Sequence, residues 1–127
     1  QVNLLASEAN IAEFDAVVFI GGAGMGKNLD NSDFQRIAKE AVEKDKVLGA
    51  ICIAPALLAK AGVLKGKKAT VWSNSMDKSA IRILEGGGAA HAAEDVVIDG
   101  KIITASGPLA AKKFGQALIE ILTGSSE

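Results

Sequence analysis

Several features that carry function in other proteins are scarce or absent in this chain of 127 residues. It has one cysteine and one histidine, so it can form neither an internal disulfide nor a closed zinc site from its own side chains. No apolar run approaches the roughly 20 residues that span a bilayer. No charged segment followed by an apolar one marks a signal peptide. The absence of a G-x-S-x-G motif excludes the usual serine-hydrolase signature.

The charge of the chain is nearly balanced, with a formal net value of −1 at pH 7. A nucleic-acid-binding domain usually carries a strong basic excess, so we expect no nucleic-acid partner. Hydrophobic residues make up 49% of the sequence, and its length suits one domain with a sizeable core. Together with the lack of disulfides and of an apolar span, these features predict a soluble cytoplasmic protein with no membrane partner.

Short apolar runs alternate with helical patterns along the chain. Continuous apolar runs at residues 16–20 and 47–51 predict strands that are buried on both faces, as in a parallel sheet. Between them a helix is expected, because Ser32 and Gln35 have capping-box spacing. Further expected elements are a helix at 55–61, a strand at 69–72, a helix at about 77–84, a hairpin of strands 96–98 and 101–104 with Asp99-Gly100 at the turn, and a helix opening at Pro108. This alternation predicts one α/β domain.

Cys52 is the strongest candidate for chemistry. It ends the apolar run 47–51 and is followed at once by Ile53-Ala54-Pro55 and an Ala/Leu-rich helical stretch. A buried strand that stops at a cysteine and turns sharply into a helix is typical of a nucleophile elbow. The helix N-terminus favours an anion, so a lowered thiol pKa is expected. Alternatively, the cysteine only packs in the core, as free cysteines often do.

The glycine-rich loop at residues 21–27 matches G-x-x-x-x-G-K, the pattern of a phosphate-binding loop. Asn28 stands where a Ser or Thr hydroxyl would reach a metal, and the residues after Lys27 indicate a turn rather than a helix. Nucleotide binding is therefore disfavoured, and we expect no cofactor. The loop is interpreted either as a tight strand-to-helix connection or as a cradle of backbone amides facing Cys52.

The single histidine and the single tryptophan have less specific surroundings. His91 is interpreted as a surface or loop residue, because nothing in the spacing brings it to Cys52. Trp72 ends an expected strand and is interpreted as a packing residue. One Cys and one His give no basis for a metal site.

Four stretches of the chain resemble the PfpI/DJ-1 superfamily. They are Asp15 to Gly22, the segment Ala50 to Pro55 with its following helix up to Gly66, Lys68 to Trp72, and Val96 to Pro108. The likeness covers nearly the whole chain in the family's order. It implies a flavodoxin-like three-layer sandwich, with a mostly parallel sheet, helices on both faces and a C-terminal hairpin.

The resemblance also implies site residues and activities. Cys52 is the nucleophile or oxidation-sensitive cysteine, and the amides of Gly22 and Ile53 form a pair like an oxyanion hole. The expected function is cysteine-dependent chemistry on an electrophilic carbonyl, either glyoxalase/deglycase-like or peptidase/amidase-like, with a small carbonyl compound, protein or peptide as substrate. The alternative is a non-enzymatic redox sensor or chaperone-like protein. Family members are commonly dimers, so a homodimer or higher homo-oligomer is expected.

The chain departs from the family's pattern at three places. Ile53 stands where protease-like members have a histidine, and residues 73–75 lack the histidine that many members have there. The family's catalytic glutamate belongs to an opening strand–helix–strand segment, and Glu8 and Glu13 lie beyond that segment. We therefore expect residues 1–127 to form a single domain of this type that lacks its first strand–helix–strand unit.

Overall fold

The computed structural model describes residues 16–20 and 29–123 of the chain. In chain order its elements are β1 (Ala16–Ile20), α1 (Ser32–Glu43), β2 (Val47–Ile51), α2 (Ala54–Lys60), β3 (Lys68–Ala69), α3 (Ser79–Gly86), β4 (Ala90–His91), β5 (Val96–Asp99), β6 (Ile102–Ala105), a 3₁₀ turn at Pro108–Ala110, and α4 (Ala111–Thr123). None of the helices in these ranges has the length and apolar character that a bilayer crossing requires.

The main sheet has the strand order β1-β2-β6-β5. Strands β1, β2 and β6 run parallel, with Val18 opposite Gly49 and Gly49 opposite Ile103. Strand β5 pairs antiparallel with β6, and Gly100 in the turn between them has a positive φ of 63°. A second sheet consists of β3 and β4 in parallel. The mostly parallel sheet and the C-terminal hairpin are therefore confirmed.

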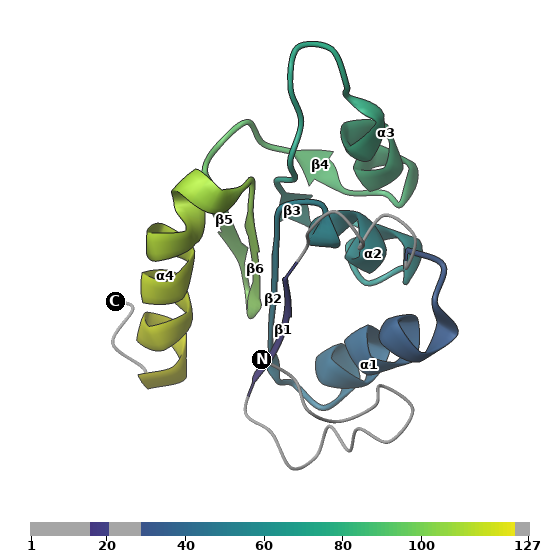
Figure 1. The fold of residues 1–127 in the computed structure, drawn as a ribbon. Coiled ribbons are helices and arrows are strands. Elements are labelled where there is room, and N and C mark those ends of the chain that lie inside the picture. Colours follow the sequence, from purple (N-terminus) through teal and green to yellow (C-terminus); the bar gives the residue numbers. More distant parts are fainter. Residues whose placement is uncertain (1–15, 21–28, 124–127) are drawn as a thin grey trace.

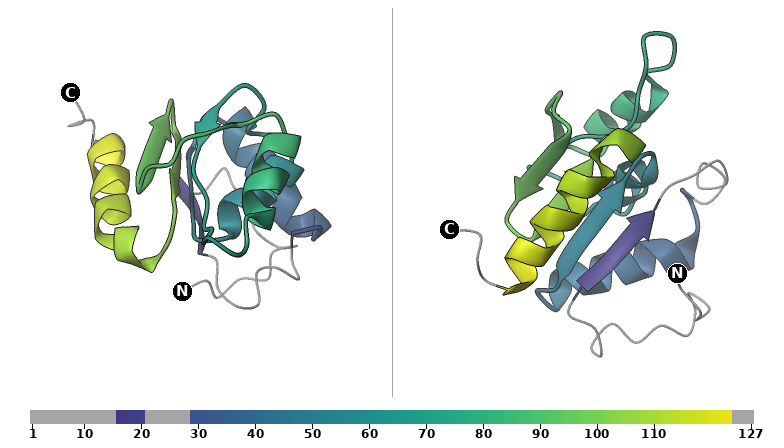
Figure 2. Two further views of the ribbon diagram at one scale, coloured as in Figure 1. Left: turned by 90° about the horizontal axis from the view of Figure 1, so that it is seen from above. Right: turned by 60° about the vertical axis from the view of Figure 1, so that its left-hand side comes forward.

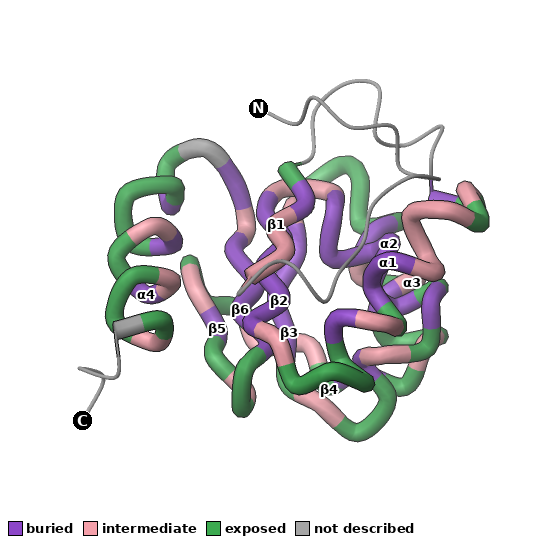
Figure 3. Tube along the Cα trace, turned by 90° about the horizontal axis from the view of Figure 1, so that it is seen from below, coloured by how far each residue is buried: buried purple, intermediate pink, exposed green. Residues whose placement is uncertain are grey.

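Helices cover both faces of the main sheet, as the three-layer expectation requires. Helix α4 packs on one face, while α1 and α2 cover the other and α3 lies against α2 (Figures 1 and 2). The pleat of β2 explains how one strand serves both layers, because Leu48 and Ala50 join the core under α1 and α2 while Val47 and Ile51 join the core under α4. Burial is concentrated along these central strands, and α4 is exposed on its outer side (Figure 3).

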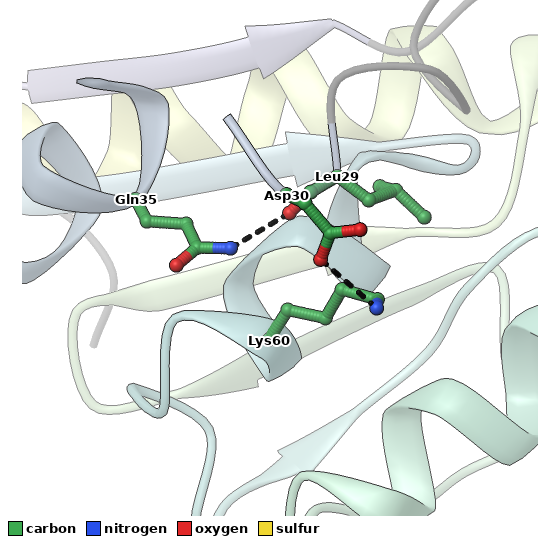
Figure 4. Close-up of polar contacts among 4 residues, drawn as sticks. All are labelled: Leu29, Asp30, Gln35 and Lys60. Atoms are coloured by element: carbon green, nitrogen blue, oxygen red, sulfur yellow. Dashed lines mark hydrogen bonds and ion pairs between the residues drawn. The ribbon is translucent and has the colours of Figure 1, made fainter. Parts of the chain in front are cut away.

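The start of α1 differs from the capping prediction by one residue. Asn31, not Ser32, is the N-cap, and its side chain accepts a 3.0 Å hydrogen bond from the Phe34 amide. Gln35 does not close a capping box; its Nε2 donates to the Leu29 carbonyl at 2.8 Å (Figure 4). Asn31 can take this role because its side-chain carbonyl reaches the third following amide from an extended backbone.

The segment before α1 is tied to α2, the helix that follows Cys52. Asp30 lies in a turn, and its Oδ1 is 3.1 Å from the Nζ of Lys60 (Figure 4). The turn expected after the glycine-rich loop is thus present at residues 29–30, and the helix begins only at Ser32. A phosphate-binding loop leads directly into its helix, so this geometry does not favour one. Lys27 itself lies outside the described residues.

Several expected elements begin or end at other residues, and for two of them the cause is a side-chain hydrogen bond. Strand β3 covers only residues 68 and 69, because the Thr70 amide leaves the ladder and donates to the Thr104 hydroxyl at 3.0 Å. Helix α3 starts at Ser79 rather than near 77, since the Asp77 carboxylate accepts bonds from the Ser79 amide and hydroxyl and so shapes the turn before the helix. Local side-chain bonds of this kind compete with regular structure.

Candidate active site at Cys52

Cys52 occupies a sharp turn between a fully buried strand and a helix. Strand β2 ends at Ile51, the next residue has a φ of +67°, and α2 begins at Ala54. Positive φ is costly for a residue with a Cβ, so the surroundings must hold it in place. They do so from two sides: the Cys52 amide donates to the Ala105 carbonyl at 3.0 Å, and its own carbonyl accepts from the Trp72 amide at 2.8 Å.

The thiol of Cys52 is free and half-buried at the end of β2. Burial raises its pKa above the ordinary value of 9.0, and a hydrogen bond from the backbone amide of Ile53 lowers it by less. The lowered pKa expected from the sequence is therefore wrong for this structure. Removing the sulfur from water disfavours the thiolate, and among the described residues no cation beside it compensates.

Of the two residues expected to form an oxyanion-hole-like pair, the structure describes only Ile53. Ile53 is the N-cap of α2 with a φ of −84°, and its backbone amide forms a hydrogen bond with the Cys52 sulfur. Gly22 lies outside the described residues, so its place opposite Cys52 stays a prediction. Glu8 and Glu13 lie outside them too.

An open hollow of ≈ 250 Å³ lies near the segments that bind the Cys52 backbone, although Cys52 itself is not among its lining residues. Its lining comes from three segments that converge at the carboxyl end of β6, and consists of Thr70, Val71, Ser73, His91, Ala93, Glu94, Asp95 and Ser106. Two of these, Val71 and Ser73, flank Trp72, whose amide binds the Cys52 carbonyl. Ser106 follows Ala105, whose carbonyl binds the Cys52 amide. The two segments whose backbone groups bind Cys52 therefore also contribute residues to the lining of the hollow.

His91 lies in β4 rather than in a loop, and it lines this open hollow, so of the two places expected from the sequence only the loop is wrong. It is half-buried in β4, where Ala69 of β3 is its partner in the ladder. Among the described residues no hydrogen bond joins its imidazole to Cys52. Trp72 is half-buried just beyond β3, and its indole Cδ1 would lie 3.7 Å from a Cβ built on Gly107, which fits the packing role expected for it.

Sequence reasoning did not single out Thr70, Glu94 and Ser106, which line the hollow. They come from separate stretches of the chain and match no motif, and only the return of β6 to the centre of the sheet brings them together. Within residues 16–20 and 29–123, no group of three His, Cys, Asp or Glu side chains is placed to hold a metal ion.

Comparisons with known proteins point to one family. A model of the DJ-1/PfpI family matches residues 1–121. The chain is 38% identical over 121 residues to the uncharacterized protein MJ0967 of Methanocaldococcus jannaschii, covering 94% of this chain and 58% of that protein. It is 32% identical over 108 residues to deglycase PfpI of Pyrococcus furiosus, covering 85% of this chain and 62% of that protein.

A solved structure supports the same assignment at the level of the fold. The ThiJ/PfpI domain protein from Brachyspira murdochii superposes with a TM-score of 0.90 and 32% sequence identity, covering 97% of this chain and 68% of that one. The chain spans about three fifths of the length of the Methanocaldococcus and Pyrococcus proteins named above.

Proposed function

This chain belongs to the DJ-1/PfpI family, and on that premise we propose that it is a cysteine-dependent enzyme acting on an electrophilic carbonyl. The observation that carries the proposal is the placement of Cys52 at φ +67° between β2 and α2, with the Ile53 amide at its sulfur. A strained non-glycine residue held by two backbone bonds is a feature typical of functional sites. A relative named as a deglycase supports the choice of carbonyl chemistry.

The proposed first step is addition of the thiol to the carbonyl group. The Cys52 sulfur forms a bond to the carbonyl carbon, the π electrons move to the oxygen, and the proton lost from sulfur ends on that oxygen. With an α-oxoaldehyde the product is a hemithioacetal; with an acyl group it is a tetrahedral adduct that then expels the amine or alcohol. The Ile53 amide, and Gly22 in the predicted pair, would stabilise the negative oxygen.

The raised thiol pKa adds a requirement to this mechanism. At neutral pH the sulfur carries its proton, so a base must remove that proton as the bond forms. Among the described residues only burial and the Ile53 backbone act on the Cys52 pKa, and no carboxylate or imidazole does. The same property weakens the alternative of a redox sensor, because peroxide oxidises the thiolate rather than the thiol.

The substrate class is tested by assaying the purified protein against methylglyoxal and against a chromogenic peptide amide. Cys52→Ser is the matched variant, since it keeps the size of the side chain and replaces sulfur by a much weaker nucleophile. We expect turnover of at least one substrate that falls more than 100-fold in Cys52→Ser. Equal turnover by both proteins overturns the proposal. Absence of turnover, together with rapid oxidation of Cys52 by mild peroxide, favours the redox sensor instead.

The homodimer and the cytoplasmic location remain predictions from the family resemblance and the composition. Sedimentation equilibrium of the chain measures the first directly. A mass of two or more 13.0 kDa chains confirms the expected homodimer or higher homo-oligomer, and a single-chain mass contradicts it.

A further inference from the structure

The described part of the chain buries only two polar residues, and they are joined to each other. Thr70 is 1% exposed and Thr104 is fully buried, whereas every other buried residue in these ranges is apolar or a glycine. The amide of Thr70 donates a 3.0 Å hydrogen bond to Oγ1 of Thr104, which lies 34 positions further along the chain. A polar group inside an apolar core is costly unless it is paired, and a fully paired one fixes a single arrangement of its surroundings.

The place of Thr104 in the sheet explains why a side chain makes this bond. Strand β6 lies between β2 and β5, so its backbone groups are directed at those two neighbours. They cannot also hold a segment that packs on the face of the sheet. The side chain of Thr104 points away from those of Ile103 and Ala105, which face α4. It therefore reaches the segment after β3, whose Val71 belongs to the core under α1 and α2.

This segment continues directly to the Cys52 turn. Two positions after Thr70, the amide of Trp72 donates its 2.8 Å bond to the Cys52 carbonyl. The second bond that holds Cys52, from its own amide, ends on the carbonyl of Ala105, the residue next to Thr104. Both bonds that keep Cys52 at a φ of +67° therefore depend on the end of β6, one directly and one through the Thr104 hydroxyl.

We propose that Thr104 is a positioning residue for Cys52, whose hydroxyl anchors residues 70–72 so that the Trp72 amide meets the Cys52 carbonyl and holds the thiol in its strained turn. Thr104 is sealed from solvent and does not touch substrate. Without the hydroxyl, the anchored segment shifts, the turn relaxes towards an ordinary φ, and water reaches the sulfur. The effect on turnover rests on the proposed function at Cys52, but the effect on the thiol itself does not.

The thiol is probed by alkylation with iodoacetamide across pH, followed by intact-protein mass, because Cys52 is the only cysteine of the chain. Thr104→Val keeps the shape of the side chain and removes the acceptor, while Thr104→Ser keeps the hydroxyl. Burial raises the pKa of the Cys52 thiol, so access of water should move the midpoint of the reaction to lower pH. We expect Thr104→Val to react at least threefold faster than wild type at pH 8, and Thr104→Ser to stay within twofold of wild type.

A control separates positioning from a general loss of stability, which would also expose the sulfur. Ile103 precedes Thr104 in the same strand and is fully buried on the α4 face. Ile103→Val and Ile103→Ala remove one and three carbons there and lower stability to different extents. All variants are compared at a temperature at which circular dichroism shows each of them folded. Both Ile103 variants should alkylate at the wild-type rate.

Hydrogen exchange of the wild-type protein tests the same link without a variant. If the Thr104 hydroxyl anchors the segment, the amides of Thr70 and Trp72 open together, and their protection factors should agree within threefold. A Trp72 amide that is at least tenfold less protected than that of Thr70 would show that the Cys52 bond opens while the anchor stays closed. That result overturns the proposal. So does wild-type alkylation of Thr104→Val, failure of Thr104→Ser to restore the rate, or equal acceleration in the Ile103 variants.

The positioning role and the proposed function fail in distinguishable ways. If both hold, Thr104→Val should lower kcat/KM for methylglyoxal at least tenfold, and Thr104→Ser should retain most of it. If no variant and no wild-type sample turns over a carbonyl substrate, but alkylation follows the expected order, the positioning role stands and the function at Cys52 is wrong. If Cys52→Ser abolishes turnover while Thr104→Val leaves it unchanged, the function stands and the positioning role is wrong.

Discussion

The amide of Trp72 donates a hydrogen bond of 2.8 Å to the carbonyl oxygen of Cys52. With the 3.0 Å bond from the Cys52 amide to Ala105, it fixes both ends of a residue whose φ is +67°. The local strain at the candidate nucleophile is thus balanced by hydrogen bonds to two other segments. This arrangement holds the thiol at the carboxyl end of the parallel strands, where α/β proteins commonly bind their ligands.

The backbone strain at Cys52 predicts that the native residue lowers the stability of the fold although it is needed for activity. Glycine adopts positive φ without steric cost, so Cys52→Gly should be more stable than Cys52→Ala by about 1 kcal/mol, although both lose activity. Urea denaturation measures the difference in the free energy of unfolding. At Ala56, inside α2, the order should reverse, with the glycine variant less stable than the native alanine by about 1 kcal/mol. The same order at both positions would contradict the strain.

The raised pKa of Cys52 predicts slow, strongly pH-dependent alkylation. Burial stabilises the neutral thiol, so the midpoint of the rate of iodoacetamide reaction should lie at higher pH than for N-acetylcysteine methylamide. By linkage, this contribution to stability is fully present below the pKa of the unfolded thiol, and it is lost as pH rises through the higher folded value. Intact-protein mass gives the rate, and a midpoint below that of the small thiol would refute burial as the dominant cause.

The buried bond between the Thr70 amide and the Thr104 hydroxyl should be important for stability. Both residues are almost fully buried, and the bond is 3.0 Å long. Thr104→Val removes the acceptor and leaves a buried amide unpaired, which costs about 1–3 kcal/mol. Thr104→Ser keeps the hydroxyl and should lose less. Thermal unfolding of the pair tests this, and equal stabilities would show that the Thr70 amide finds another partner.

Two adjacent glycines at the end of α3 should respond oppositely to alanine. A Cβ on Gly87 would lie 2.5 Å from the backbone oxygen of Ala59 in α2, so Gly87→Ala must push the two helices apart. Overpacking of this kind typically costs about 1–3 kcal/mol. A Cβ on Gly86 meets nothing within 4 Å, and Gly86→Ala should be neutral or stabilising. The urea midpoints of the two variants test this prediction. An unchanged midpoint for Gly87→Ala would contradict the close approach of α3 to Ala59.

The sequence predicts the architecture well, because the relevant signals are local. Continuous apolar runs identified β1 and β2 to the residue, and Asp99-Gly100 identified the hairpin. Bonds between distant segments account for the errors. Strand β3 is shorter than expected because Thr70 pairs with a side chain of β6, and the Cys52 pKa rises because the fold removes water around the sulfur.

The hollow lay beyond prediction for a similar reason. Its polar residues Thr70, Glu94 and Ser106 belong to no motif in the sequence. They come together only through the strand order β1-β2-β6-β5, which places the end of β6 next to the end of β2. The family resemblance identified the cysteine, but it does not extend to this lining.

The most direct test of the central claim is the mass of the intact protein during reaction with methylglyoxal, followed by peptide mapping. If Cys52 is the nucleophile, an adduct of one methylglyoxal should appear on the peptide that contains Cys52, decay as substrate is exhausted, and be absent in Cys52→Ala. Consumption of methylglyoxal at an unchanged rate in Cys52→Ala, without an adduct at this residue in the wild type, would contradict the account.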